Sequence, residues 1–127
     1  MTLRSMLVVF LFFASAVPAL ACKQSTGETT RDKTVAAWIC SKFATSTDVT
    51  AITVQQQLIM NVHLTLELYR GLRADEVFGE KMLRDFHKLF LSRTGKNSAT
   101  VNLYVDGDKV ADAQSTLLSG TRVRLRL

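Results

Sequence analysis

Residues 58–69, LIMNVHLTLELY, alternate between apolar and mostly polar side chains. Successive side chains of a β-strand point to opposite faces of its sheet, so this pattern predicts a long strand with one apolar face. That face needs a cover, and the rest of the chain contains amphipathic helical patterns that suit it. We therefore expect an α+β fold whose helices pack on the side chains of Leu58, Met60, Val62, Leu64, Leu66 and Leu68.

The N-terminal residues have the three parts of a secretory signal peptide. An arginine supplies the positive start, 6–17 is an unbroken run of apolar and small residues, and Ala19 and Ala21 fit a signal peptidase. The run is too short for a good membrane span. We expect residues 1–21 to be removed, so that a periplasmic or secreted chain begins at Cys22.

Two alternatives to this cleavage stay open. The segment could be retained as an N-terminal anchor, or Cys22 could carry a lipid. Bacterial lipoprotein signals resemble Leu-x-x-Cys, but here Ala19 takes the leucine position and Leu20 lies one residue late. Ordinary cleavage before Cys22 is therefore the better interpretation.

The composition fits a single α+β domain over 31–127, preceded by a flexible polar tail at 22–30. The chain has 127 residues, 47% of them hydrophobic, and a net charge of +5, which falls to +4 when the signal peptide takes its one arginine away. A mild positive charge favours contact with anionic surfaces, but nucleic-acid-binding proteins are far more densely charged. We expect no nucleic-acid partner and no transmembrane segment after cleavage.

Cys22 and Cys40 are the only cysteines, and both survive the expected cleavage. An even pair in an oxidising compartment predicts a disulfide, which would tie the tail to the first helix. The alternatives are a free buried Cys40 or a catalytic thiol. No histidine lies near Cys40 in the sequence, which argues against catalysis.

The first helix is predicted at 31–44, where apolar residues recur at helical spacing. Thr29 and Asp32 form a capping box at its start. Trp38 lies on the flank of the apolar face. It is either a half-buried residue at the rim of the core or a platform for a ligand, and we favour the core.

The second helix is predicted at 75–93, with Asp75 as its N-cap and Gly95 as its left-handed C-cap. Its apolar residues form one arc that suits packing on the sheet. His87 falls outside this arc, so we expect it to face solvent.

Residues 49–56 are rich in β-branched side chains and predict a second strand before the alternating stretch. Gln55-Gln56-Gln57 would then be a turn or a bulge, although it lacks the glycine of tight hairpins. One bent strand over 49–69, or a helix over part of it, remains an alternative.

The C-terminal third is predicted to be β-structure. Residues 99–105 alternate and are followed by Asp106-Gly107, a strong hairpin signal. The chain returns over 109–114, turns again at Ser119-Gly120, and ends in a strand at 122–127.

This order predicts a two-layer sandwich of αββαββ(β) type, with two helices packed on one face of a mixed sheet and a right-handed crossover between parallel strands. Over 31–105 the order of elements resembles that of the ring-building and BON-type domains of bacterial envelope proteins. No motif of those families is present, so the resemblance assigns no site residue.

No residue pattern indicates catalysis, a metal site or a cofactor. His63 and His87 lie on different predicted elements without a carboxylate at a useful spacing, and Asp106 and Asp108 lack the further ligands of a calcium loop. We therefore expect a non-enzymatic interaction module, for instance an accessory subunit of an envelope secretion or surface-fibre assembly. Its partner would be another envelope or secreted protein.

A row of arginines on the last strand supports an alternative function. Arginines spaced two apart project from one face, where they either deter edge-to-edge aggregation or bind a polyanion. The alternative function is an anion- or glycan-binding protein that uses Arg122, Arg124, Arg126, Tyr104, His63 and Tyr69.

Overall fold

The computed structural model describes residue 22 and the ranges 24–43, 45–116 and 120–125. The expected signal peptide and Arg126 lie outside these residues.

Six strands and three helices make up the described part of the chain: β1 (Gln24–Gly27), α2 (Thr30–Ser41), β2 (Val49–Gln55), β3 (Ile59–Leu64), α3 (Leu66–Ala74), α4 (Glu76–Thr94), β4 (Thr100–Val105), β5 (Asp108–Thr116) and β6 (Gly120–Leu125). The strands form one mixed sheet in chain order. The pairs β1–β2 and β3–β4 are parallel, and the other neighbours are antiparallel.

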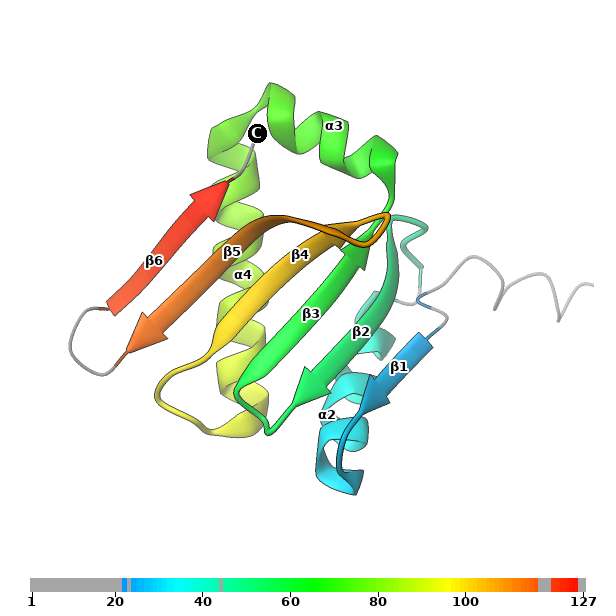
Figure 1. Cartoon of the computed structure of the whole chain (residues 1–127), viewed down its shortest axis with the longest axis vertical. Helices are drawn as coiled ribbons and strands as arrows, with labels where there is room; N and C mark the ends of the chain where they lie inside the picture. The colour runs from blue at the N-terminus through cyan, green and yellow to red at the C-terminus, as the bar shows by residue number, and fades with distance from the viewer. Residues whose placement is uncertain (1–21, 23, 44, 117–119, 126–127) are drawn as a thin grey trace, which may run out of the picture.

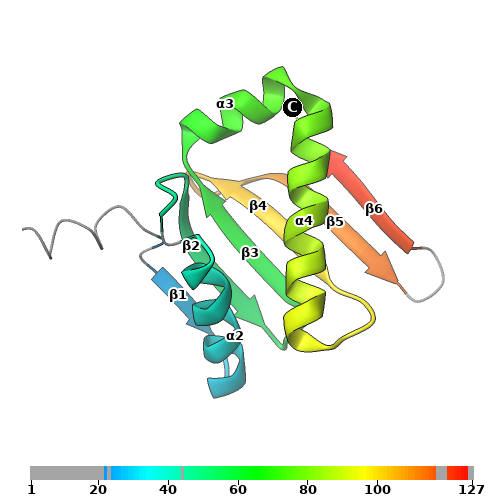
Figure 2. The same cartoon turned by 180° about the vertical axis from the view of Figure 1, so that it is seen from behind.

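The helices α2 and α4 cover the same face of the sheet. They lie behind it in Figure 1 and in front of it in Figure 2, while α3 crosses near one end of the strands. The opposite face carries none of the described helices. This arrangement confirms the predicted α+β class with helices on one face of a mixed sheet.

The predicted tail is wrong where it covers β1, because this short strand pairs in parallel with β2. The disulfide between Cys22 and Cys40 is confirmed, and it fastens the residues just before β1 to helix α2. Closing a loop of this length stabilises a fold by about 3 kcal/mol in the chain-entropy account. A four-residue edge strand needs such an anchor because its own ladder is short.

The predicted long strand is also wrong beyond Leu64. Strand β3 ends at Leu64, and Thr65 is the N-cap of α3, where its hydroxyl oxygen accepts a hydrogen bond from the Leu68 N–H (3.3 Å). Leu66 and Leu72 would share one face of a strand, because they are an even number of residues apart. Instead Leu72 is buried while Leu66 is 45% exposed, as a helical period allows. A short run such as LELY fits both periods, and only the capping contacts separate them.

Residues Gln55 to Gln57 form a turn rather than a bulge. Gln56 and Gln57 have φ values of 54° and 52°, so both occupy the left-handed region, as the two central residues of a type I′ turn do. For residues other than glycine and asparagine, this backbone conformation is less stable than the right-handed one by roughly 1 kcal/mol or more. Something else in the fold must therefore hold the turn.

Asp32 supplies that support. Its side chain has no exposed area and accepts hydrogen bonds from the backbone N–H groups of Thr29 (3.2 Å), Gln56 (3.2 Å) and Gln57 (2.9 Å), and from the Gln57 side-chain amide. Burial opposes ionisation of this carboxyl, but the bonds from Gln57 and Thr29 outweigh it and hold the pKa of Asp32 below its ordinary value. The predicted capping box is confirmed, and the same residue also fixes the β2–β3 turn.

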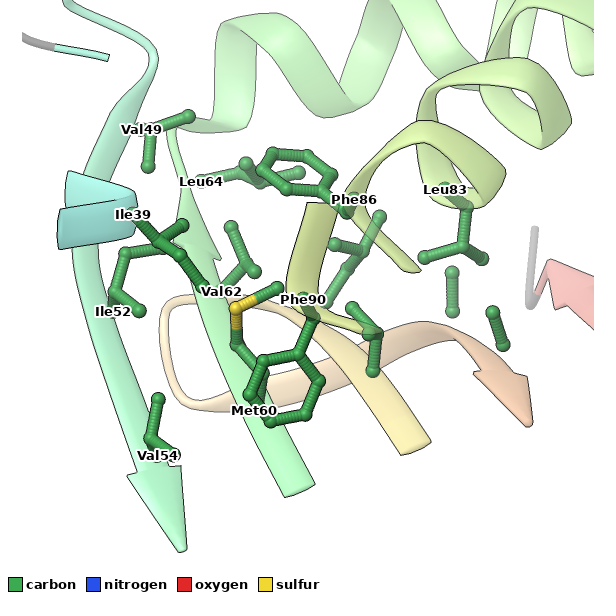
Figure 3. Packing of buried hydrophobic residues seen from close by; sticks show 14 of the residues in the cluster. Ile39, Val49, Ile52, Val54, Met60, Val62, Leu64, Leu83, Phe86 and Phe90 are labelled. Atoms are coloured by element: carbon green, nitrogen blue, oxygen red, sulfur yellow. The ribbon is translucent and has the colours of Figure 1, made fainter. Parts of the chain in front are cut away.

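The core lies between the sheet and helices α2 and α4. Figure 3 shows Phe86 of α4 directed toward Leu64 of β3, and Phe90 directed toward Met60. The predicted caps of α4 are confirmed, since Asp75 accepts from the Phe78 N–H (3.1 Å) and Gly95 ends the helix at φ 74°.

The expectation that His87 faces solvent is wrong. Its side chain is 2% exposed, and its Nε2 lies 2.8 Å from Ser115 Oγ on β5. Helix α4 packs near β6 as well as over β4 and β5, so a wider part of its surface is buried than its apolar arc suggests. Burial lowers the pKa of His87. A hydrogen bond with the backbone of Ala99 raises the pKa in part, and the positive charge of Arg84 lowers it again.

The role of Asp32 predicts that Asp32→Asn lowers the free energy of unfolding by about 1.5–3 kcal/mol, because an amide has one acceptor oxygen for the donors that a carboxylate satisfies. Asp75→Asn is the matched control and should change stability by less than about 0.5 kcal/mol, since asparagine caps helices well. Urea unfolding at pH 7 measures both, and equal losses would contradict this account.

The pH dependence follows from the same pKa. A folded-state pKa below the ordinary 3.8 means that the folded chain binds this proton more weakly than the unfolded chain. The stabilisation is therefore complete above about pH 4 and disappears as the pH falls through the folded pKa. This component of acid destabilisation should be absent from Asp32→Asn.

Candidate binding face on the open side of the sheet

The face of the sheet opposite the helices is built from the polar halves of the alternating strands. On β3, Met60, Val62 and Leu64 are buried against the helices, so Asn61 and His63 point to the open side. The half of the prediction that concerned alternation within β3 is therefore confirmed.

One row of polar side chains crosses the whole open face. In the register of the six strands, the row consists of Thr26, Thr53, Asn61, Asn102, Asp112 and Arg124. Its members bond in pairs: the two threonine hydroxyls share a hydrogen bond (3.1 Å), and Asn102 Nδ2 donates to Asn61 Oδ1 (3.0 Å).

The last pair of this polar row is charged. Asp112 has no exposed area, and the Arg124 guanidinium donates to both of its carboxylate oxygens through Nε (3.2 Å) and one terminal nitrogen (3.4 Å). Lys109 Nζ lies 3.6 Å from the same carboxylate. A buried carboxylate needs charged partners, so Arg124 stabilises the fold through Asp112 although its own side chain is exposed.

Asn102 Oδ1 is buried and accepts no hydrogen bond from the described residues. The whole residue is only 9% exposed, and its Nδ2 is already used by Asn61. Leaving a buried acceptor unpaired costs about 1–3 kcal/mol. The centre of the polar row therefore contains a buried acceptor that no donor of the described residues satisfies.

An aromatic pair stands in the adjacent row. The rings of His63 and Tyr104 are stacked with centroids 5.3 Å apart and an interplanar angle of 22°. Their outer neighbours in the register are Ala51 and Lys109, and the alanine is too small to cover the other face of the imidazole. Burial lowers the pKa of His63, so its ring is neutral at pH 7 and offers both a donor and an acceptor.

The structure describes two members of the predicted arginine row. Val123 and Leu125 pack against the core, and Arg122 and Arg124 are exposed on the open side. Arg124 is occupied by Asp112, whereas Arg122 lies opposite Gln114 and has no acidic partner among the described residues. Arg126 lies outside the described residues.

The structure brings His63, Tyr104, Arg122 and Arg124 to one face, as expected, but not Tyr69. Tyr69 belongs to α3, where it packs against the core and its ring lies 5.9 Å from the Arg73 guanidinium. The assignment of Tyr69 to this face is wrong because the chain turns from strand to helix at Thr65.

Sequence reasoning missed Asn61, Asn102 and Asp112 as members of the site. The one available signal was Asp112 itself, a lone acid between two alanines in a predicted strand. Its pairing with Arg124 depends on the register of β5 and β6, which no local pattern fixes.

Other chemistry finds little support in the part of the chain that the structure describes. These residues contain no group of three histidine, cysteine, aspartate or glutamate side chains placed to hold a metal ion. His87 and Ser115 are hydrogen-bonded, but His87 is buried between its own helix α4 and strand β5. Trp38 is half-buried at the edge of the core and lies under the cations of Lys42 (4.5 Å) and Arg93 (5.0 Å).

Comparison with known proteins adds no assignment. Neither a protein-family model, nor a curated protein sequence, nor a solved structure matches the chain. Among the described helices, none is both long and apolar enough to cross a membrane.

The contact between Arg124 and Asp112 predicts unequal roles for the two exposed arginines. Arg124→Met should lower the free energy of unfolding by about 1–3 kcal/mol, because a buried carboxylate loses its two-bond partner. Arg122→Met is the matched control and should stay within about 0.5 kcal/mol of the parent.

Adding Asp112→Asn to Arg124→Met should restore part of the lost stability, because the buried charge is then gone. Chemical unfolding of the three variants decides the question. Equal changes in the free energy of unfolding for the two arginine substitutions would show that the Arg124–Asp112 pair does not stabilise the fold.

Proposed function

We propose that this protein is an exported, non-enzymatic interaction module that presents the open face of its sheet to another envelope or secreted protein. The observation that carries the proposal is the polar row across all six strands, on a face that none of the described helices covers. An accessory subunit of an envelope secretion or surface-fibre assembly is a setting in which such a module would serve.

The composition of the open face suits a protein partner. Tyrosine and arginine are enriched in protein interfaces, and here Tyr104 and Arg122 lie on the same face as the polar row. The charges at the β6 side are mostly positive, because the single carboxylate of Asp112 is shared by Arg124 and Lys109. We therefore expect the partner surface to be acidic.

Export and the absence of catalysis belong to the same proposal. The Cys22–Cys40 disulfide is typical of oxidising compartments, and the signal-like N-terminus agrees with it. On the open face His63 stacks on Tyr104, and no carboxylate in the described residues bonds to its ring. A face of this kind binds but offers no acid–base pair.

Charge reversal at Arg122 tests the proposed face. Arg122→Glu should weaken capture of the partner from an envelope extract by about fivefold or more, because an exposed cation with no acidic partner among the described residues becomes a repulsive charge. Arg84→Glu is the matched control, since Arg84 is an exposed arginine on α4, which packs on the other side of the sheet.

Captured proteins are quantified by mass spectrometry at two salt concentrations. Capture by the parent should weaken at the higher salt, where exposed charges are screened. Identical capture by the parent and Arg122→Glu, or equal loss with Arg84→Glu, would contradict the proposed face.

A glycan is the second candidate ligand, and a specific observation favours it. The stacked rings of His63 and Tyr104 are only partly buried on the open face, and an aromatic surface beside polar side chains is a common platform for a sugar ring. Because Arg124 is already neutralised by Asp112, a hydroxyl-rich ligand fits better than a densely charged polyanion.

A glycan array separates these ligands. Binding to an arrayed glycan should fall by about tenfold in Tyr104→Leu, which removes the stacked ring, and stay unchanged in Tyr69→Leu on α3. Absence of any arrayed ligand for the folded parent would rule the glycan candidate out and leave the protein partner as the proposal.

A further inference from the structure

A groove of about 520 Å³ opens on the helix side of the molecule, away from the polar face. It lies between the segment that follows α2, the start of β2, helix α3 and the part of α4 from Phe78 to Leu89, a region that Figure 2 shows from the helix side. Its apolar lining consists of Phe43, Val49, Leu68, Phe78, Met82, Phe86 and Leu89.

The apolar side chains of this groove are incompletely covered. Phe43, Leu68, Met82 and Leu89 are only partly buried, and Phe78 is 49% exposed. Figure 3 shows Phe86 and Val49 at this end of the core, and the Phe86 ring lies 5.0 Å from that of Phe43. Removing apolar surface from water is favourable, so a molecule that fills the groove gains free energy from covering these side chains.

The polar residues at the border of the groove already have partners. Lys81 Nζ lies 2.9 Å from Asp85 Oδ2, and Asp48 Oδ1 accepts from the Thr65 hydroxyl (3.1 Å). They therefore offer little directional recognition to a ligand. Selection in this groove has to come from apolar contact and shape.

A small molecule fits these observations better than a protein segment. Protein interfaces of standard size need about 800 Å² on each partner, with an apolar centre. Here the exposed large apolar side chains other than Phe78, namely Leu58, Leu66 and Val77, do not line the groove. The outer surface of α4 beside it carries Glu80, Arg84 and Lys88.

We propose that this groove binds a small apolar molecule whose main part is an aliphatic or acyl chain. Its volume falls within the roughly 300–1,000 Å³ of small-molecule sites, which are lined mostly by apolar and aromatic side chains. Met82, Leu68 and Leu89 have flexible side chains that adapt to a chain without a fixed shape. The groove shares no residue with the open face, so the test of this proposal is independent of the test of the proposed function.

A neutral fluorescent probe tests the groove in the purified, disulfide-bonded protein. N-phenyl-1-naphthylamine should bind with saturation near one molecule per chain, and dodecanol and dodecanoate should displace it. Displacement by both is expected because the polar border groups already pair with one another.

Met82→Trp fills the groove and should weaken probe binding by about tenfold or more. Val77→Trp is the matched control: it adds the same side chain five residues earlier on α4, at a position that is 79% exposed and outside the lining, and should bind as the parent does. Absence of saturable binding in the parent, or equal loss in both variants, would overturn the proposal.

A second measurement covers the case in which Met82→Trp does not fold. Adding dodecanol to the ¹⁵N-labelled parent should shift the amide signals of Phe43, Leu68 and Leu89 and leave those of Asn61 and Asn102 on the open face unchanged. Shifts confined to the open face, or no shifts up to the solubility limit of the alcohol, would overturn the proposal and leave the groove to a protein segment.

Discussion

The buried carboxylate of Asp32 is the interaction on which the arrangement of this fold depends. It joins the first turn of α2 to the β2–β3 turn, two places that are distant in the sequence. By holding Gln56 and Gln57 in the left-handed region, it fixes where β2 ends and β3 begins. A slip of one residue in that hairpin would move every side chain of β3 to the wrong face.

The register set by this turn divides the sheet into two different surfaces. On one side Met60, Val62 and Leu64 meet the helices, and on the other Asn61 and His63 join a polar row and an aromatic pair. The polar residues of the open face are strongly interconnected, and Asp112 is as inaccessible as any core residue. This face is consequently preorganised, so the proposed binding of a partner would cost less conformational entropy than on a mobile surface.

Each side of the sheet has groups that lack a favourable contact, and the missing contact is polar on one side and apolar on the other. Asn102 Oδ1 on the open face lacks a hydrogen-bond donor, whereas the groove beside Phe78 and Met82 lacks apolar contact. Each deficit costs stability that a fold could avoid by local substitution. Because they lie on opposite sides, the proposed partner and the proposed apolar ligand would not compete for the same surface.

The sequence by itself determined the features that rest on local rules. The alternation of β3, the caps Thr29, Asp75 and Gly95, and the Cys22–Cys40 pair follow from side-chain period, capping chemistry and cysteine count. Tertiary structure alone decided the end of β3, because LELY fits both a strand and a helix until its contacts are known. It also decided the bond between Asp112 and Arg124 and the burial of His87, since these depend on strand register and helix packing between segments far apart in the chain.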